Sequence, residues 1–178
     1  IVLEEYELAK KRGAPIYAEL VGGGLTADAH HITAPHPEGL GACNVMRLAI
    51  EDANAKISDI DYINVHGTST PLGDIAETKA IKSLFGEQAY KLNISATDSM
   101  TGHLLGAAGA IEAIACIMAI KDGVIPPTIN HATDDPEIDS RLNFTFNKAE
   151  KKEVRAASSN TFGFGGHNAT VIFKKYEG

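Results

Sequence analysis

Residues 103–121 read HLLGAAGAIEAIACIMAIK, and this run predicts one long helix. Apolar residues lie on every side of it, while its glycines and alanines allow neighbouring backbone to approach closely. Such a helix belongs in the core of a protein. Glu112 is the charged residue inside it, and burying an ionised carboxylate without a partner costs several kcal/mol. We therefore expect Glu112 to have a partner.

Strand and helix patterns alternate along the rest of the chain. Strands are predicted at residues 15–21, 62–65, 92–95, 144–146, 154–158 and 169–173, and helices at residues 3–13, 39–53 and 73–85. The glycines that follow the first strand, Gly22–Gly24, predict a turn. This alternation predicts an α/β fold in which helices cover a sheet whose last strands pair antiparallel.

The length, apolar content and net charge of the chain limit the classes of function that it can have. The chain has 178 residues, of which 44% are apolar, and a net charge of -7. A chain of this length buries about 70% of its unfolded surface in a single core, so we expect one domain over residues 1–178. The acidic balance argues against nucleic acid or an anionic membrane as the main partner. No apolar run approaches the roughly 20 residues that cross a bilayer, so a cytoplasmic protein is expected.

Two histidines lie on turns rich in glycine and threonine. His66 stands in VHGTST (residues 65–70), and His103 follows SMTG (residues 99–102). A third loop, FGFGGH, spans residues 162–167. Two neutral imidazoles beside hydroxyls and a glycine-hinged loop suit a reaction at a thioester carbonyl, because donors must stabilise the negative charge that develops on oxygen. These segments predict half of an active site, since no plausible nucleophile stands in a comparable setting.

The other histidines and both cysteines are given structural roles. Cys43 and Cys116 fall in apolar helical patterns, as buried free thiols do, so neither a disulfide nor a zinc site is expected. The remaining histidines are His30, His31, His36, His131 and His167. Their spacing matches no common metal site, so no metal is expected.

Three segments together resemble a known family. NVHGTSTPLGD (residues 64–74), SMTGHLLGAAG (residues 99–109) and SNTFGFGGHN (residues 159–168) look like the C-terminal half of an elongating, type II β-ketoacyl-acyl-carrier-protein synthase. The resemblance implies a thiolase-like fold of two similar halves, with a cysteine nucleophile in an N-terminal half that this chain does not contain. It also implies that acyl chains are lengthened in fatty-acid biosynthesis by decarboxylative Claisen condensation with malonyl carrier protein.

The resemblance implies catalytic roles for three residues. His66 and His103 match the histidines that hydrogen-bond the malonyl thioester carbonyl, and Phe164 matches a gating phenylalanine whose backbone amide completes the oxyanion hole. The physical chemistry of the predicted helix agrees with this role for His103. A position at the positive end of a helix disfavours an imidazolium and keeps a neutral N–H donor.

The family resemblance also implies which residues contact the substrate and which molecules are partners. Thr68 and Thr70 match hydroxyls that touch a pantetheine arm, and the loop of residues 28–35, with Thr33, resembles a second mobile loop at the acyl entrance. No cofactor is expected, because the phosphopantetheine arm is carried by the acyl carrier protein substrate. The expected partners are acyl carrier protein, the missing N-terminal half and a second copy of the chain, with neither nucleic acid nor membrane among them.

One position departs from the pattern. The family carries a lysine immediately before the SMTGH turn, where this chain has Asp98, and that lysine pairs with the glutamate matched by Glu112. The expected pair is therefore two carboxylates. They cannot both ionise cheaply a few ångströms apart in a low-dielectric site, so the pKa of at least one should be raised. The alternative is that Asp98 points into solvent and Glu112 finds another donor.

These residues are compatible with two functions. Retention of His66, His103 and the glycine loop favours a condensing enzyme, whereas Asp98 favours a non-catalytic partner like a chain-length factor. A thiolase is less favoured because its last glycine loop would carry a cysteine. Initiating synthases pair a histidine with an asparagine, where this chain has a second histidine. The isolated chain is expected to be inactive.

Overall fold

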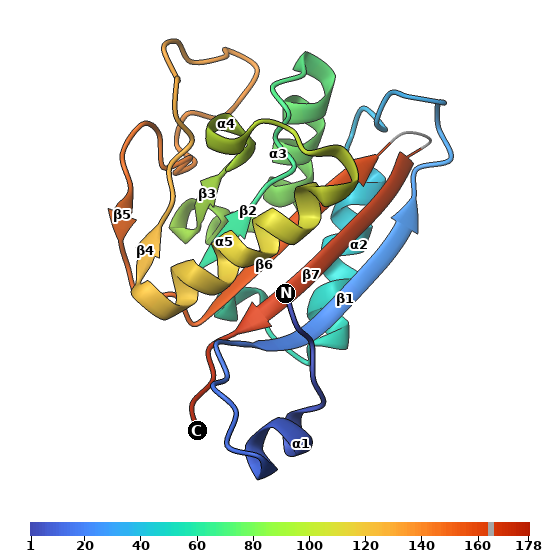
Figure 1. The fold of residues 1–178 in the computed structure, drawn as a ribbon. Helices are drawn as coiled ribbons and strands as arrows, with labels where there is room; N and C mark the ends of the chain where they lie inside the picture. Colours follow the sequence, from blue (N-terminus) through green and yellow to red (C-terminus); the bar gives the residue numbers. More distant parts are fainter. Residues whose placement is uncertain (164–165) are drawn as a thin grey trace.

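A computed structural model describes residues 1–163 and 166–178, which include a mixed five-stranded sheet (Figure 1). The strands lie in the order β1-β7-β6-β2-β3. Strands β6, β2 and β3 run parallel, while β7 is antiparallel to both of its neighbours, which confirms the expected pairing of the last strands. Their bounds are β1 (Glu19–Ala27), β2 (Tyr62–Asn64), β3 (Asn93–Ser95), β6 (Ala156–Gly163) and β7 (His167–Lys174).

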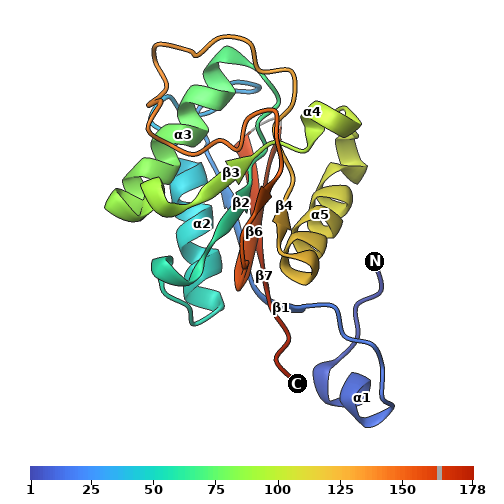
Figure 2. The same cartoon turned by 90° about the vertical axis from the view of Figure 1, so that its left-hand side faces the viewer.

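Helices cover both faces of this sheet, which Figure 2 shows edge-on. Helices α2 (Leu40–Asp52) and α3 (Pro71–Phe85) lie on one face, and α5 (Ala108–Asp122) lies on the other. The short α4 (Asp98–Thr101) follows β3, and α1 (Tyr6–Lys11) lies away from the sheet. A separate antiparallel pair joins β4 (Val124–Ile125) to β5 (Glu150–Lys151). The helices predicted at residues 39–53 and 73–85 are confirmed.

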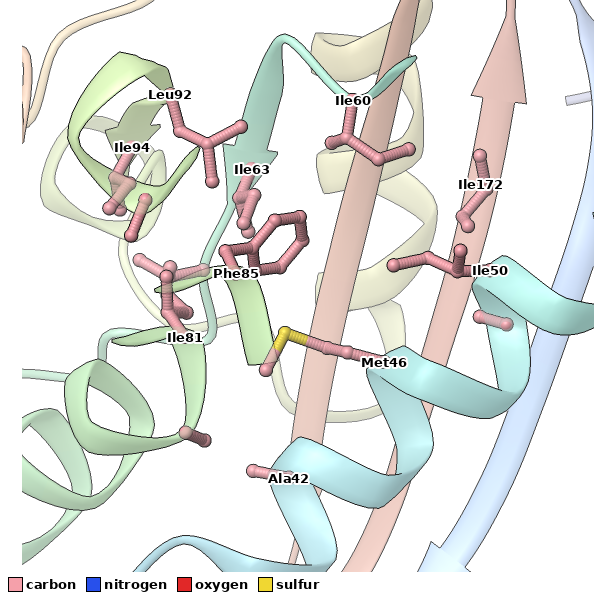
Figure 3. Close-up of a cluster of buried hydrophobic side chains, with 14 of the residues drawn as sticks. Ala42, Met46, Ile50, Ile60, Ile63, Ile81, Phe85, Leu92, Ile94 and Ile172 are labelled. Atoms are coloured by element: carbon pink, nitrogen blue, oxygen red, sulfur yellow. The ribbon is translucent and has the colours of Figure 1, made fainter. Parts of the chain in front are cut away.

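Alternation along the central strands sends apolar side chains into two cores. Ile63 of β2 packs on the side of α2 and α3, where Met46 and Phe85 also lie (Figure 3). The preceding residue, Tyr62, points to the opposite face and packs with Cys116 of α5. Burial of each side chain of this size contributes roughly 1.5–3 kcal/mol.

The predicted helix over residues 103–121 is wrong in its first turn. Gly102 has a φ of 74° and Leu105 a φ of 52°, and this left-handed backbone interrupts the helix. Residues Leu105–Ala107 form a 3-10 turn, and α5 begins at Ala108. His103 therefore lies before the 3-10 turn and not at the N-terminus of α5, so the dipole of this helix does not favour its neutral form.

Helix α5 is also only partly buried. Cys116 and Ala119 on its inner side are 0% and 1% exposed, whereas Ile114 and Met118 are 43% and 38% exposed. No helix within residues 1–163 and 166–178 has the length and apolar character needed to cross a membrane.

The turn predicted at Gly22–Gly24 is also wrong, because these glycines lie inside β1. A Cβ on Gly22 would collide with the carbonyl oxygen of Ala49, and one on Gly24 would collide with the carbonyl oxygen of Val45. Both carbonyls belong to α2. The glycines are needed for close approach of this helix to the strand and not for a turn.

Residues 144–146 were expected in the sheet but stand outside it. Phe146 forms an isolated bridge with Thr128, in a segment that passes over α3 and β3 (Figure 2). The last parallel strand is longer than predicted, because β6 continues through buried polar residues to Gly163. Its polar side chains gave no alternating apolar signal.

The seam between β1 and α2 gives a test with an internal control. Gly22→Ala should lower the free energy of unfolding by about 1–3 kcal/mol, because the added methyl group overpacks the contact with α2. Gly23→Ala should be neutral or slightly stabilising, since its nearest neighbour would be the carbonyl oxygen of Thr170 at 3.9 Å. Urea unfolding of the two variants measures both values. Equal losses would show that the glycines do not serve helix packing.

Candidate functional site

The loops that carry the expected site leave the same edge of the sheet. His66 follows β2, Asp98 follows β3, and the loop of residues 28–35 follows β1, all at the ends where these strands finish. Carboxyl ends of parallel strands meet at one edge, where α/β proteins place their ligand sites. The structure brings His66 and His103 together here, with ring centroids 5.5 Å apart and an interplanar angle of 79°.

The turn at His66 is held by a carboxyl group that the sequence analysis missed. The backbone N–H groups of His66 and Gly67 donate to the two oxygens of Glu77, each at 3.1 Å. The amide of Asn160 donates to the same side chain at 3.1 Å. Glu77 is 3% exposed, and burial raises its pKa to about 7 although these donors oppose the change. The sequence signal that could have revealed this role is an acidic residue on the side of α3 that faces the core.

The imidazole of His66 is held in its neutral form. Burial lowers the pKa of this ring, and the neighbouring His103 lowers it further. Its Nδ1 atom is buried and has no hydrogen-bond partner among residues 1–163 and 166–178. A neutral imidazole retains one N–H group, which can donate to a ligand oxygen.

Asp98 contacts His103 and not Glu112. Its Oδ2 atom lies 2.8 Å from Nδ1 of His103, and the Asp98 side chain is 8% exposed. The expected pairing of Asp98 with Glu112 is therefore wrong as a direct contact. The alternative is wrong for Asp98, whose side chain does not point into solvent, but it is correct for Glu112, which finds other donors. The short helix α4 ends just before Gly102, where the chain turns back and brings the His103 ring against Asp98.

Glu112 finds hydroxyl donors instead. Its Oε2 atom accepts from Thr161 at 3.3 Å and from Ser159 at 3.5 Å, while Oε1 has no partner in the described part of the chain. The residue is 1% exposed. Burial raises the pKa of Glu112 to about 7, and the negative charge of Asp98 adds to the shift. The two carboxyl groups thus interact through space without sharing a hydrogen bond.

A cavity of about 880 Å³ is lined by Glu77, Asp98 and His103, but not by His66 or Glu112. Thr68 also lines it, and many of the other lining residues come from the segment of residues 128–146. This segment was missed because the sequence analysis treated His131 as an ordinary loop residue. Its ring stacks on Phe146 at 3.6 Å between centroids.

The remaining expected residues are distributed differently. Thr70 and Thr33 are exposed and do not line the cavity, although Oγ1 of Thr70 lies 3.4 Å from Oγ1 of Thr68. Phe164 lies outside the described residues. Cys116 is buried in α5, where burial raises the pKa of its thiol far above the usual range, and Cys43 is half-buried in α2. Neither cysteine lines the cavity.

Comparisons with known proteins agree on one family. Residues 17–132 match the family model described as "Beta-ketoacyl synthase, C-terminal domain". The chain is 54% identical over 177 residues to 3-oxoacyl-[acyl-carrier-protein] synthase 2 of Staphylococcus aureus, covering 99% of this chain and 42% of the relative. The chain thus spans less than half the length of this curated relative.

Solved structures show the same fold. A type II PKS acyl-carrier protein in complex with its ketosynthase superposes with a TM-score of 0.93 and 38% identity, over 97% of this chain and 42% of that one. The ishigamide ketosynthase/chain length factor gives a TM-score of 0.89 and 42% identity, and the match covers 96% of this chain and 41% of that one. The expected thiolase-like α/β fold is confirmed by these ketosynthase neighbours.

The raised pKa of Glu112 predicts a pH dependence of stability. A folded-state pKa raised from 4.5 to about 7 adds stability that is complete below about pH 4.5 and is lost as the pH rises through 7. The shift is equivalent to about 3 kcal/mol. Glu112→Gln stays neutral, so between about pH 5 and 8 it should lose about 2.5 kcal/mol less than the parent.

Chemical unfolding at several pH values measures this difference. Glu87→Gln, at an exposed position, is the matched control and should follow the parent. A Glu112→Gln variant that loses as much stability as the parent would contradict the raised pKa.

Proposed function

Because this chain belongs to the β-ketoacyl synthase family as its C-terminal domain, we propose that it is the C-terminal half of a 3-oxoacyl-acyl-carrier-protein synthase. The reaction is decarboxylative Claisen condensation with malonyl carrier protein, which elongates acyl chains in fatty-acid biosynthesis. The observation that carries the proposal is the pair of imidazoles, His66 and His103, whose ring centroids lie 5.5 Å apart, with His103 lining a cavity. We treat residues 1–178 as one domain of the complete protein.

The proposed chemistry begins at the thioester carbonyl of the malonyl group. Loss of carbon dioxide leaves negative charge on that carbonyl oxygen, and a neutral imidazole N–H from His66 stabilises it by hydrogen bonding. Thr68 and Thr70 lie beside His66, where their hydroxyls would contact a pantetheine arm. No cofactor of the chain's own is required, because this arm arrives on the carrier protein. Phe164 and Thr33 are proposed to lie at the acyl entrance.

The nucleophile comes from outside these 178 residues in this proposal. The thiol of Cys116 is buried and its pKa is raised, so it forms little thiolate, the form that attacks a thioester. Cys43 lies in α2, away from the cavity. We propose that the N-terminal half of the fold supplies the cysteine and packs on the exposed side of α5, whose apolar residues include Ile111, Ile114 and Met118.

The chain alone should therefore yield no 3-oxoacyl product from acyl and malonyl carrier proteins. A chimera that carries this chain in place of the matched part of the S. aureus synthase 2 supplies the other half. Product formation by the chimera should fall at least tenfold in His66→Ala and in His103→Ala, whereas Glu87→Gln should be unchanged. Mass spectrometry of the carrier protein measures the product. Turnover by the isolated chain that disappears in Cys43→Ser or Cys116→Ser would overturn the assignment of the nucleophile.

Asp98 supports a second candidate, a non-catalytic partner similar to a chain-length factor. Among the structural neighbours is a ketosynthase/chain length factor, 42% identical to this chain. The chimera separates the two candidates, because an inactive, correctly folded chimera that regains product formation with Asp98→Lys would favour the non-catalytic partner. Activity of the chimera with Asp98 in place would favour the enzyme.

We also propose a cytoplasmic protein that works with acyl carrier protein and assembles as a homodimer. In the isolated chain, where no N-terminal half covers it, the exposed apolar side of α5 favours association, as do the neighbouring Leu104 and Leu105. Light scattering of the isolated chain should give a mass of two chains or more. A monomer at high concentration would contradict this expectation.

A further inference from the structure

The contact between Asp98 and His103 is held by the backbone that joins them. Asp98 is the first residue of α4, and the N–H of Gly102 donates to the Asp98 carbonyl oxygen at 2.8 Å. This closed turn places the next residue, His103, against the Asp98 side chain, with Nδ1 2.8 Å from Oδ2. Asp98 has a side chain only 8% exposed, so water competes little for the contact.

The direction of this hydrogen bond follows from the chemistry of the two groups. A carboxylate has lone pairs only, so the hydrogen in the contact belongs to Nδ1 of His103. A neutral imidazole carries one N–H, and the other nitrogen is then an acceptor. We propose that Asp98 is a positioning residue that fixes His103 as the Nδ1–H tautomer, leaving Nε2 as a hydrogen-bond acceptor and base rather than a donor.

The two histidines then differ in their hydrogen-bonding roles. The Nδ1 atom of His66 is buried and has no partner within residues 1–163 and 166–178, so no carboxylate fixes its tautomer. An N–H on its other nitrogen, Nε2, is the donor that a ligand could reach. The pair therefore suits a ligand that offers a carbonyl oxygen to His66 and a hydroxyl or water hydrogen to His103. This differs from the expectation that both rings donate to one carbonyl oxygen.

The proposal deepens the proposed function and rests on it for the identity of the ligand. If His103 acts as a base, an O–H bond of water or of a ligand hydroxyl breaks, its electron pair stays on oxygen, and the proton forms a new bond to Nε2. The imidazolium produced is stabilised by the adjacent Asp98 carboxylate. In this way Asp98 acts through His103 and needs no contact with the ligand.

Nuclear magnetic resonance of the 15N-labelled chain tests the tautomer without any substrate. Two-bond 1H–15N correlations at alkaline pH, where imidazoles are neutral, identify which ring nitrogen carries hydrogen. In the parent, Nδ1 of His103 should be protonated. Asp98→Lys places a donor on Nδ1 and should reverse the tautomer to Nε2–H, and Asp98→Ala should remove the preference for Nδ1–H.

A second histidine provides the matched control. His131 lies with Nε2 3.1 Å from Oδ1 of Asp134, so Asp134→Ala should alter the signals of His131 and leave the tautomer of His103 unchanged. Protonated Nε2 of His103 in the parent, or an Nδ1–H tautomer that persists in Asp98→Ala, would overturn the proposal. Because the readout needs no turnover, failure of the condensation assay with the Nδ1–H tautomer present would count against the proposed function alone.

Discussion

The buried carboxyl group of Glu77 holds together the elements on which the site depends. From α3 it accepts the backbone N–H groups of His66 and Gly67, and it also accepts from the side chain of Asn160 in β6. The oxygen of Asn160 in turn accepts from Thr170 in β7. Removing this one side chain would leave the backbone N–H groups of His66 and Gly67 without their acceptor and Asn160 with only Met46 Sδ, and each lost bond to a buried donor costs about 1–3 kcal/mol. The direction of the His66 ring thus depends on packing between a helix and two strands that carry no catalytic group.

A second buried acid, Glu112, lies on the opposite face of the sheet, and burial raises its pKa to about 7 as it does that of Glu77. The carboxyl edge of the sheet is therefore bounded on both faces by groups whose charge changes near neutral pH. These groups make the site edge sensitive to protonation, while the apolar interior of the sheet is not.

The sequence predicted the convergence of His66 and His103, because both turns follow parallel strands whose ends meet at one edge. It did not predict their partners. A glycine pattern such as Gly22–Gly24 is equally typical of a turn and of close helix packing, and a leucine with positive φ, such as Leu105, has no sequence signal. Asp98 reaches the histidine ring only because the chain turns at Gly102, and this contact was missed because the family resemblance had placed Asp98 against Glu112.

The contact between α2 and β1 limits how this protein can change during evolution. In most helix–sheet contacts a larger residue on one side can be compensated by a smaller residue on the other. Here the strand side is already glycine at positions 22 and 24, so nothing smaller is available opposite Ala49 and Ala53. A larger side chain at either position could be accommodated only if the whole helix moved. Such a shift would also displace the loop of residues 28–35, which joins β1 to this helix, so two alanines outside both histidine turns help to fix the shape of the site.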